Sequence, residues 1–114
     1  MDKTIKAIVD AIEEKKGENI VVLDLRKLDG AVCDYYVICE AQSTMQVDAM
    51  AGEVEHRVET KLHERPLRVQ GRENALWIII DYGNIMVHLF ERETRAYYGL
   101  EKLWSDAPAT RFGE

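Results

Sequence analysis

Residues 34–66 read DYYVICEAQSTMQVDAMAGEVEHRVETKLHERP, and within this stretch the pattern of a strand changes to that of a helix. Aromatic and β-branched side chains predict a strand over residues 34–39. Ser43 and Gln46 have the spacing of a capping box, which opens a helix that we expect to run to about Glu64. Its apolar side chains form one continuous stripe: Val47, Met50, Ala51, Val54, Val58 and Leu62. A strand, a long helix and further strand are typical of a βαβ unit, so the sequence predicts an α/β fold.

Shorter elements flank this unit on both sides. An amphipathic pattern predicts a helix over residues 4–15, and a nearly continuous apolar run predicts a strand over residues 19–25. After the long helix we expect a short strand at residues 67–70. Residues 91–104 then end the folded part in helical turns.

Residues 75–90 contain two apolar runs on either side of a tight loop, which predicts a hairpin. If the loop has two residues, Gly83 and Asn84, one face of the hairpin is apolar throughout and belongs to the core. This core face carries Ile78, Ile80, Tyr82, Ile85, Val87 and Leu89, while the other face carries Trp77, Ile79, Asp81, Met86, His88 and Phe90. The predicted order of elements is α-β-β-α-β-β-β-α, in a mixed sheet with helices packed on it.

Length and composition restrict the class of protein. A chain of 114 residues has room for one domain, which we expect at residues 1–107, with a flexible tail at residues 108–114. No apolar run approaches the roughly 18 residues that a membrane span needs, and no secretory signal is visible, so we expect a cytoplasmic protein. The net charge of −6 favours a basic protein partner over direct RNA contact, because nucleic acids are bound mainly by Lys and Arg.

Catalytic and metal sites find little support in the sequence. Asp81 and His88 lie on the same predicted face of the hairpin, where an acid–base pair is conceivable, but no nucleophile lies nearby in the chain. A half-buried histidine bonded to a neighbour, or a binding surface, explains the same residues. His56 and His63 lie two helical turns apart with no third ligand, so we predict no metal ion and no cofactor.

Apart from Tyr82 on the core face, aromatic side chains gather at the predicted hairpin and in the segment that follows it. They are Trp77, Phe90, Tyr97, Tyr98 and Trp104. Aromatic residues beside a polar rim are typical of the centres of protein–protein interfaces. These rings therefore either fill a second layer of the core or form a surface for a partner or a second copy of the chain.

Several strings resemble the ribosomal silencing factor family, also called the Iojap family. They are VLDL at residues 22–25, DYYVIC at residues 34–39 and WIIIDYGNIMVHLF at residues 77–90. The end of the chain is similar in order and spacing, with Arg95, Tyr97-Tyr98, Leu100-Glu101, Leu103-Trp104 and Asp106-Ala107. The likeness extends over residues 3–107. The chain departs from the family pattern at Glu40-Ala41, where a glycine is usual, and at Met45, where an arginine often stands.

This resemblance implies a nucleotidyltransferase-like fold without transferase activity. It implies a protein that binds the large ribosomal subunit through large-subunit ribosomal protein fourteen, blocks joining of the small subunit and represses translation. The contact residues carried over from the matching motifs are Trp77, Asp81, Tyr82, His88, Tyr98 and Trp104. The rings would anchor the partner, and Asp81 and His88 would supply orienting hydrogen bonds.

Two other functions stay open at this point. A relic nucleotidyltransferase would use Asp24 and Asp81 to hold a metal ion and a nucleotide. A homodimeric scaffold would use the aromatic surface for self-association, and the free protein would then be a homodimer.

Overall fold

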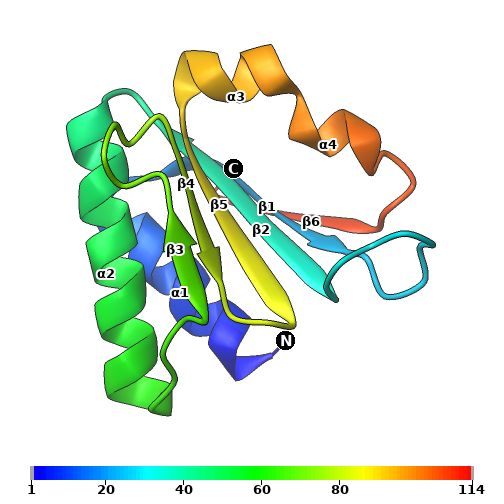
Figure 1. Ribbon diagram of the computed structural model, residues 1–114, viewed down its shortest axis with the longest axis horizontal. Helices are drawn as coiled ribbons and strands as arrows, with labels where there is room; N and C mark the ends of the chain where they lie inside the picture. The colour runs from blue at the N-terminus through cyan, green and yellow to red at the C-terminus, as the bar shows by residue number, and fades with distance from the viewer. Residues whose placement is uncertain (1, 114) are drawn as a thin grey trace.

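A six-stranded mixed sheet forms the centre of the molecule (Figure 1), and the computed structural model describes it over residues 2–113. The elements follow in the order α1 (Lys3–Glu14), β1 (Glu18–Asp24), β2 (Tyr35–Ala41), α2 (Thr44–Leu62), β3 (Arg68–Gln70), β4 (Trp77–Asp81), β5 (Ile85–Glu91), α3 (Arg92–Tyr98), α4 (Leu100–Leu103) and β6 (Ala109–Phe112). The α/β class predicted from the sequence is confirmed.

The strands lie in the order β3-β4-β5-β2-β1-β6. Only β2 and β5 pair in parallel, and the other neighbours are antiparallel. The predicted βαβ unit is present in a wider form. Helix α2 joins β2 to β3, which runs in the same direction at the edge of the sheet, and the β4–β5 hairpin fills the two positions between them.

Helices α1 and α2 lie together on one side of the sheet (Figure 1) and enclose the larger core. Helix α2 begins as predicted, because the Ser43 hydroxyl accepts a hydrogen bond from the Gln46 amide at 3.2 Å. It ends at Leu62, slightly before the predicted Glu64. His63 takes the left-handed backbone conformation there and closes the last turn.

The β4–β5 hairpin has the predicted register. Ile79 pairs with His88, and the loop turns at Gly83 and Asn84. Every side chain assigned to the core face of the hairpin is buried against α1 and α2: Ile78, Ile80, Tyr82, Ile85, Val87 and Leu89. The alternation of the two apolar runs was therefore sufficient to fix which side of the hairpin faces the main core.

Helices α3 and α4 pack on the other face of the sheet. They follow β5 directly and are separated from each other by Gly99, which has a positive φ of 56°. Together with the loop at residues 25–34 they cover a second, smaller core. This core contains Val21, Leu23, Leu25, Tyr36, Ile38, Phe90, Leu100 and Ala107. Much of β4 stays outside this cover.

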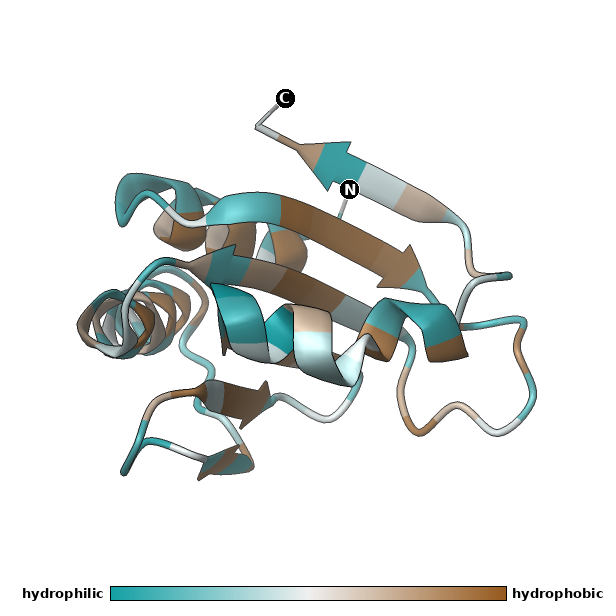
Figure 2. Ribbon diagram, turned by 90° about the horizontal axis from the view of Figure 1, so that it is seen from above, coloured by the Kyte–Doolittle hydropathy of each residue, from teal (hydrophilic) through white to brown (hydrophobic). Residues whose placement is uncertain are grey.

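The prediction of a flexible tail at residues 108–114 is wrong for residues 109–112. These form β6, which pairs with β1 from Leu23 opposite Ala109 to Ile20 opposite Phe112. In Figure 2 this strand lies at the outer edge of the sheet. The strand is held by backbone hydrogen bonds that would otherwise be missing along the outer side of β1. Residue 114 lies outside the described residues.

Candidate partner-binding surface

The uncovered part of the second sheet face carries a group of half-buried and exposed apolar side chains, which we call the aromatic face. Its members are Trp77, Ile79, Met86, Tyr98 and Trp104. Asp81 lies at the end of the same row on β4. Strand alternation places Trp77, Ile79 and Asp81 on this side of β4, and Tyr98 comes from the end of α3. The surface therefore combines a sheet face with the helices that follow it.

Trp77 and His88 are joined by a hydrogen bond across the hairpin. The indole Nε1 of Trp77 donates to Nδ1 of His88 over 3.1 Å. An imidazole nitrogen that accepts a hydrogen bond carries no proton, so His88 is neutral and its hydrogen is on Nε2. Burial lowers the pKa of His88 to about 4, while the nearby Glu101 opposes this shift. His88 thus supports Trp77 from beneath rather than reaching a partner.

A continuous row of rings links the two tryptophans. The ring of Trp77 lies 4.9 Å from that of Tyr98 and 4.8 Å from that of Phe90. On the other side of His88, the ring of Tyr36 lies 4.4 Å away and meets Trp104 edge-on at 6.2 Å. Four of the predicted site residues, Trp77, His88, Tyr98 and Trp104, are therefore brought together.

The other two predicted site residues behave differently. Asp81 is half-exposed, and its Oδ1 accepts a hydrogen bond from the Gly83 amide at 2.8 Å, so it closes the hairpin turn. Tyr82 lies on the opposite side of the sheet, buried in the main core, and burial raises the pKa of its hydroxyl. Tyr82 does not belong to the aromatic face, because side chains of consecutive strand residues point to opposite sides.

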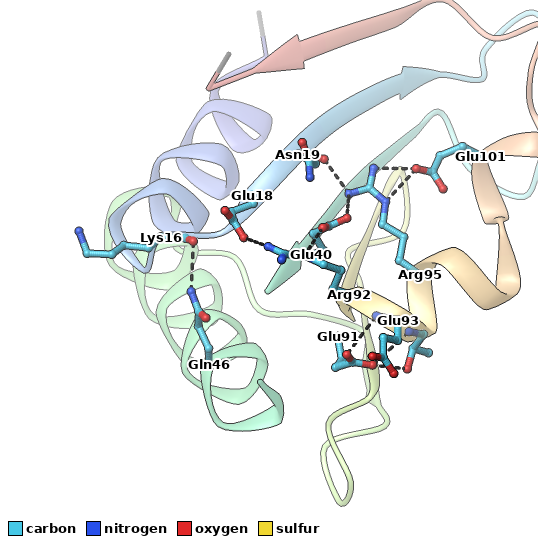
Figure 3. A network of polar contacts seen from close by, with 11 residues as sticks. Lys16, Glu18, Asn19, Glu40, Gln46, Glu91, Arg92, Glu93, Arg95 and Glu101 are labelled. Carbon is cyan, nitrogen blue, oxygen red and sulfur yellow. Dashed lines mark hydrogen bonds and ion pairs between the residues drawn. The ribbon is translucent and has the colours of Figure 1, made fainter. Parts of the chain in front are cut away.

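An ion-pair network that sequence reasoning missed holds α3 and α4 against the sheet (Figure 3). Arg95 is only 7% exposed, and its guanidinium bonds to Glu40 at 3.1 Å and to Glu101 at 2.6 Å. It also donates to the backbone carbonyl of Asn19 at 2.7 Å. Arg92 joins Glu40 to Glu18. The carboxylate of Glu40 is thus compensated by two arginines.

A groove of about 710 Å³ opens beside Trp77, between α3 and the turn that joins β3 to β4. Its walls include Leu76, Trp77, Glu91, Glu93, Tyr97 and Tyr98. Glu91 also caps α3, since its carboxylate accepts hydrogen bonds from the Glu93 and Thr94 amides. The groove is continuous with the aromatic face and carries negative charge.

The two aspartates of the relic-enzyme alternative lie far apart. Strands β2 and β5 separate β1, which ends at Asp24, from β4, which ends at Asp81. Three strand spacings amount to roughly 14 Å, too far for one metal ion to bridge. Arg26 pairs with Asp24 at 2.8 Å and lowers its pKa to about 2. Residues 2–113 contain no cluster of three or more His, Cys, Asp or Glu side chains that could hold a metal.

Comparison with known proteins agrees with the resemblance seen in the strings. The model of a protein family described as "Ribosomal silencing factor during starvation" matches residues 1–114. The chain belongs to the ribosomal silencing factor family. The family is a regulatory one. No helix within residues 2–113 is long and apolar enough to cross a membrane.

Relatives within and beyond bacteria share this domain. The chain is 38% identical over 109 residues to the "Ribosomal silencing factor RsfS" of Halalkalibacterium halodurans, covering 91% of this chain and 87% of that protein. It is 29% identical over 106 residues to the mouse "Mitochondrial assembly of ribosomal large subunit protein 1", covering 89% of this chain and 45% of that longer protein. The names of these relatives connect the domain with the ribosome.

Solved structures confirm the mixed α/β fold. A crystal structure of a Chromobacterium violaceum protein superimposes with a TM-score of 0.85 at 28% identity, covering 92% of this chain and 88% of that one. A structure from Bacillus halodurans gives a TM-score of 0.79 at 35% identity, covering 95% and 96% of the two chains. The likeness to nucleotidyltransferases stays a prediction.

Proposed function

We propose that this protein uses the aromatic face to bind large-subunit ribosomal protein fourteen on the large ribosomal subunit. The bound protein then blocks joining of the small subunit and represses translation. The observation that carries the proposal is a partly uncovered sheet face on which Trp77, Tyr98 and Trp104 lie together. Membership in the ribosomal silencing factor family indicates that the ribosome is the target of this regulation.

The preorganisation of these rings supports a binding role. The hydrogen bond to His88 fixes the indole of Trp77, and Phe90 packs against its face. Side chains that are already ordered lose little entropy when a partner binds, and rigid aromatic residues dominate interface energies. A surface whose side chains are already ordered therefore loses little binding free energy when the partner docks.

Charge supports a protein as the direct contact. The chain carries 21 acidic and 15 basic residues, which disfavours extended contact with RNA phosphates and favours a basic ribosomal protein. We assign no cofactor to this activity, because occlusion of a subunit surface requires none. A bacterial protein of this kind would act in the cytoplasm, where the ribosomes are.

The test is a subunit-joining experiment. Dissociated subunits are mixed with the protein at clear molar excess and separated on a sucrose gradient, where we expect fewer whole ribosomes. Tyr98→Ala should weaken binding to large subunits by about 2 kcal/mol, the scale of an interface anchor. Met45→Ala, an exposed apolar side chain on α2, is the matched control. A gradient unchanged by the wild-type protein would rule out the occlusion mechanism.

A homodimer is the second candidate, and the exposure of Leu103 beside Trp104 favours it. Burying these side chains against a second copy would remove apolar surface from water. Light scattering over a range of concentrations, with and without large subunits, separates the two. Self-association that excludes large-subunit binding would make the face a dimer interface alone.

A further inference from the structure

We propose that the groove beside Trp77 receives a lysine or arginine side chain of the partner protein. The inference rests on the proposed function and deepens it, because it names the chemistry of the group that is recognised. The groove lies where the sheet face meets α3, so an occupant would contact the aromatic face at the same time. At about 710 Å³ it is larger than the hollow of about 240 Å³ lined by Leu103 and Trp104 at the other end of the surface.

The aromatic wall of the groove suits a cation. The ring of Tyr98 lies 4.9 Å from Trp77 and meets Tyr97 edge-on at 5.1 Å. Tyr97 is 83% exposed and Tyr98 is 55% exposed, so both rings present surface to an incoming group. Ammonium and guanidinium groups are attracted to the faces of tryptophan and tyrosine rings, and their methylene stems pack along them.

The negative charge of the groove also favours a basic side chain as its occupant. Glu91 and Glu93 line it, and no Lys, Arg or His is among its lining residues. The neighbouring Arg92 is turned toward Glu18 and Glu40 (Figure 3), and within residues 2–113 it forms its ion pairs with those two carboxylates and not with Glu91 or Glu93. Glu93 forms no ion pair with any residue in the described part of the chain. A basic side chain would therefore meet the exposed carboxylate of Glu93 and the negative charge of Glu91, whose hydrogen bonds come from α3 and not from a cation in the groove. An RNA phosphate would be repelled by the same two charges.

The groove is also held open by its walls. On one side, Arg72 in the β3–β4 turn bonds to Asp48 at 3.0 Å and to Glu55 at 2.9 Å, which ties the turn to α2. On the other side, the network around Arg95 ties α3 to the sheet. A site whose two walls are anchored separately needs little rearrangement on binding.

The first experiment measures the groove without the ribosome. Amide and indole resonances of the labelled protein are followed by NMR while a blocked pentapeptide with one Arg and one Lys between glycines is added. The control peptide has norleucine at both basic positions, which keeps the methylene stems and removes the charges. We expect shifts at Glu93, Tyr97, Tyr98 and the Trp77 indole with the basic peptide only. Equal responses to both peptides, or no response at these sites, would overturn the inference.

The second experiment measures the groove on the ribosome. Affinity for purified large subunits is compared for the wild-type protein, Glu93→Lys and Glu13→Lys. Glu13 is an exposed acid on α1 and serves as the matched control for net charge. We expect Glu93→Lys to weaken binding about tenfold, because it places a like charge opposite the basic group of the partner, and Glu13→Lys to change it much less. Equal effects of the two substitutions would show that only overall charge matters and would refute the groove.

The outcomes separate the two proposals. If the wild-type protein fails to bind large subunits, the proposed function fails, and the peptide titration still decides whether the groove takes a cation. If the wild-type protein binds and Glu93→Lys binds equally well, the function stands and the groove is not the site of recognition.

Discussion

The indole nitrogen of Trp77 donates its hydrogen to Nδ1 of His88 over 3.1 Å, so a buried imidazole on β5 orients the indole ring on β4. The pair is buried on the His88 side and open on the Trp77 side. Because the imidazole must be neutral to accept this bond, the orientation of Trp77 depends on the protonation of His88. The aromatic face therefore has a defined pH range in which it keeps its geometry.

The first prediction concerns stability and pH. Burial places the pKa of His88 at about 4 in the folded protein, against 6.5 in the unfolded chain. The unfolded chain then binds more protons than the folded one between these values. Above pH 6.5 the neutral His88 takes nothing from the free energy of unfolding. As the pH falls toward 4, protonation of the unfolded chain lowers that free energy, by about 2 kcal/mol at pH 5. Urea unfolding at pH 7 and pH 5 measures it.

His88→Gln is the comparison for this prediction, because glutamine keeps an acceptor for Trp77 and does not titrate. Its free energy of unfolding should change less between the two pH values than that of the wild type. His56→Gln, at an exposed position on α2, should behave as the wild type does. Identical pH dependence in all three proteins would mean that His88 is not held neutral by burial.

The second prediction separates the ring of Trp77 from its hydrogen bond. Trp77→Phe keeps an aromatic ring over Phe90 but leaves Nδ1 of His88 buried without its donor. An unsatisfied buried acceptor costs about 1–3 kcal/mol, which corresponds to a lower Tm by thermal scan. Tyr98→Ala, at a 55% exposed position, should leave Tm nearly unchanged and weaken only large-subunit binding. Equal losses of Tm in the two variants would contradict this division.

The third prediction concerns the ion network beneath α3. Arg95→Met removes the partner of one Glu40 oxygen and of Glu101 and leaves the Asn19 carbonyl without its donor. Breaking a buried ion pair from one side costs about 3–5 kcal/mol. Glu40→Gly should cost less because Arg95 keeps its other two acceptors, Glu101 and the Asn19 carbonyl. Denaturant titrations of both variants give the comparison, and a larger loss for Glu40→Gly would contradict the assignment of Arg95 as the centre.

The fourth prediction compares two glycines. A Cβ at Gly71 would lie 2.1 Å from the Trp77 carbonyl oxygen, at a φ of +88°, so Gly71→Ala must displace the turn that walls the groove. We expect a loss of more than about 1 kcal/mol together with weaker binding of the basic peptide. Gly52→Ala is the matched change: its Cβ meets nothing within 4 Å on α2, and it should stabilise the protein by up to about 1 kcal/mol. Similar thermal scans for the two variants would show that the turn tolerates a side chain.

Local patterns were sufficient to predict much of this fold. The register of the hairpin and its two faces follow from the alternation of side chains around Gly83 and Asn84. The start of α2 follows from the Ser43 cap. In both cases the interactions that decide the structure lie within a few residues of one another in the chain.

The features that were missed depend on distant partners. Strand β6 carries no apolar alternation, and it forms because β1 offers it a free row of backbone groups. Arg95 and Glu40 are 55 residues apart, so no spacing rule connects them. Tyr82 was named as a contact residue on the resemblance to a family motif, but it is buried in the main core. The alternation of side chains along the hairpin had already predicted this burial.

The chain contains two tryptophans, Trp77 and Trp104, and both lie on the aromatic face. All of its indole emission therefore originates at the proposed docking surface, beside His88 in one case and Tyr36 in the other. A partner that binds here and excludes water from the two indoles changes the wavelength and intensity of that emission, so no dye has to be attached. Replacing one indole at a time would show in real time which end of the surface is covered first.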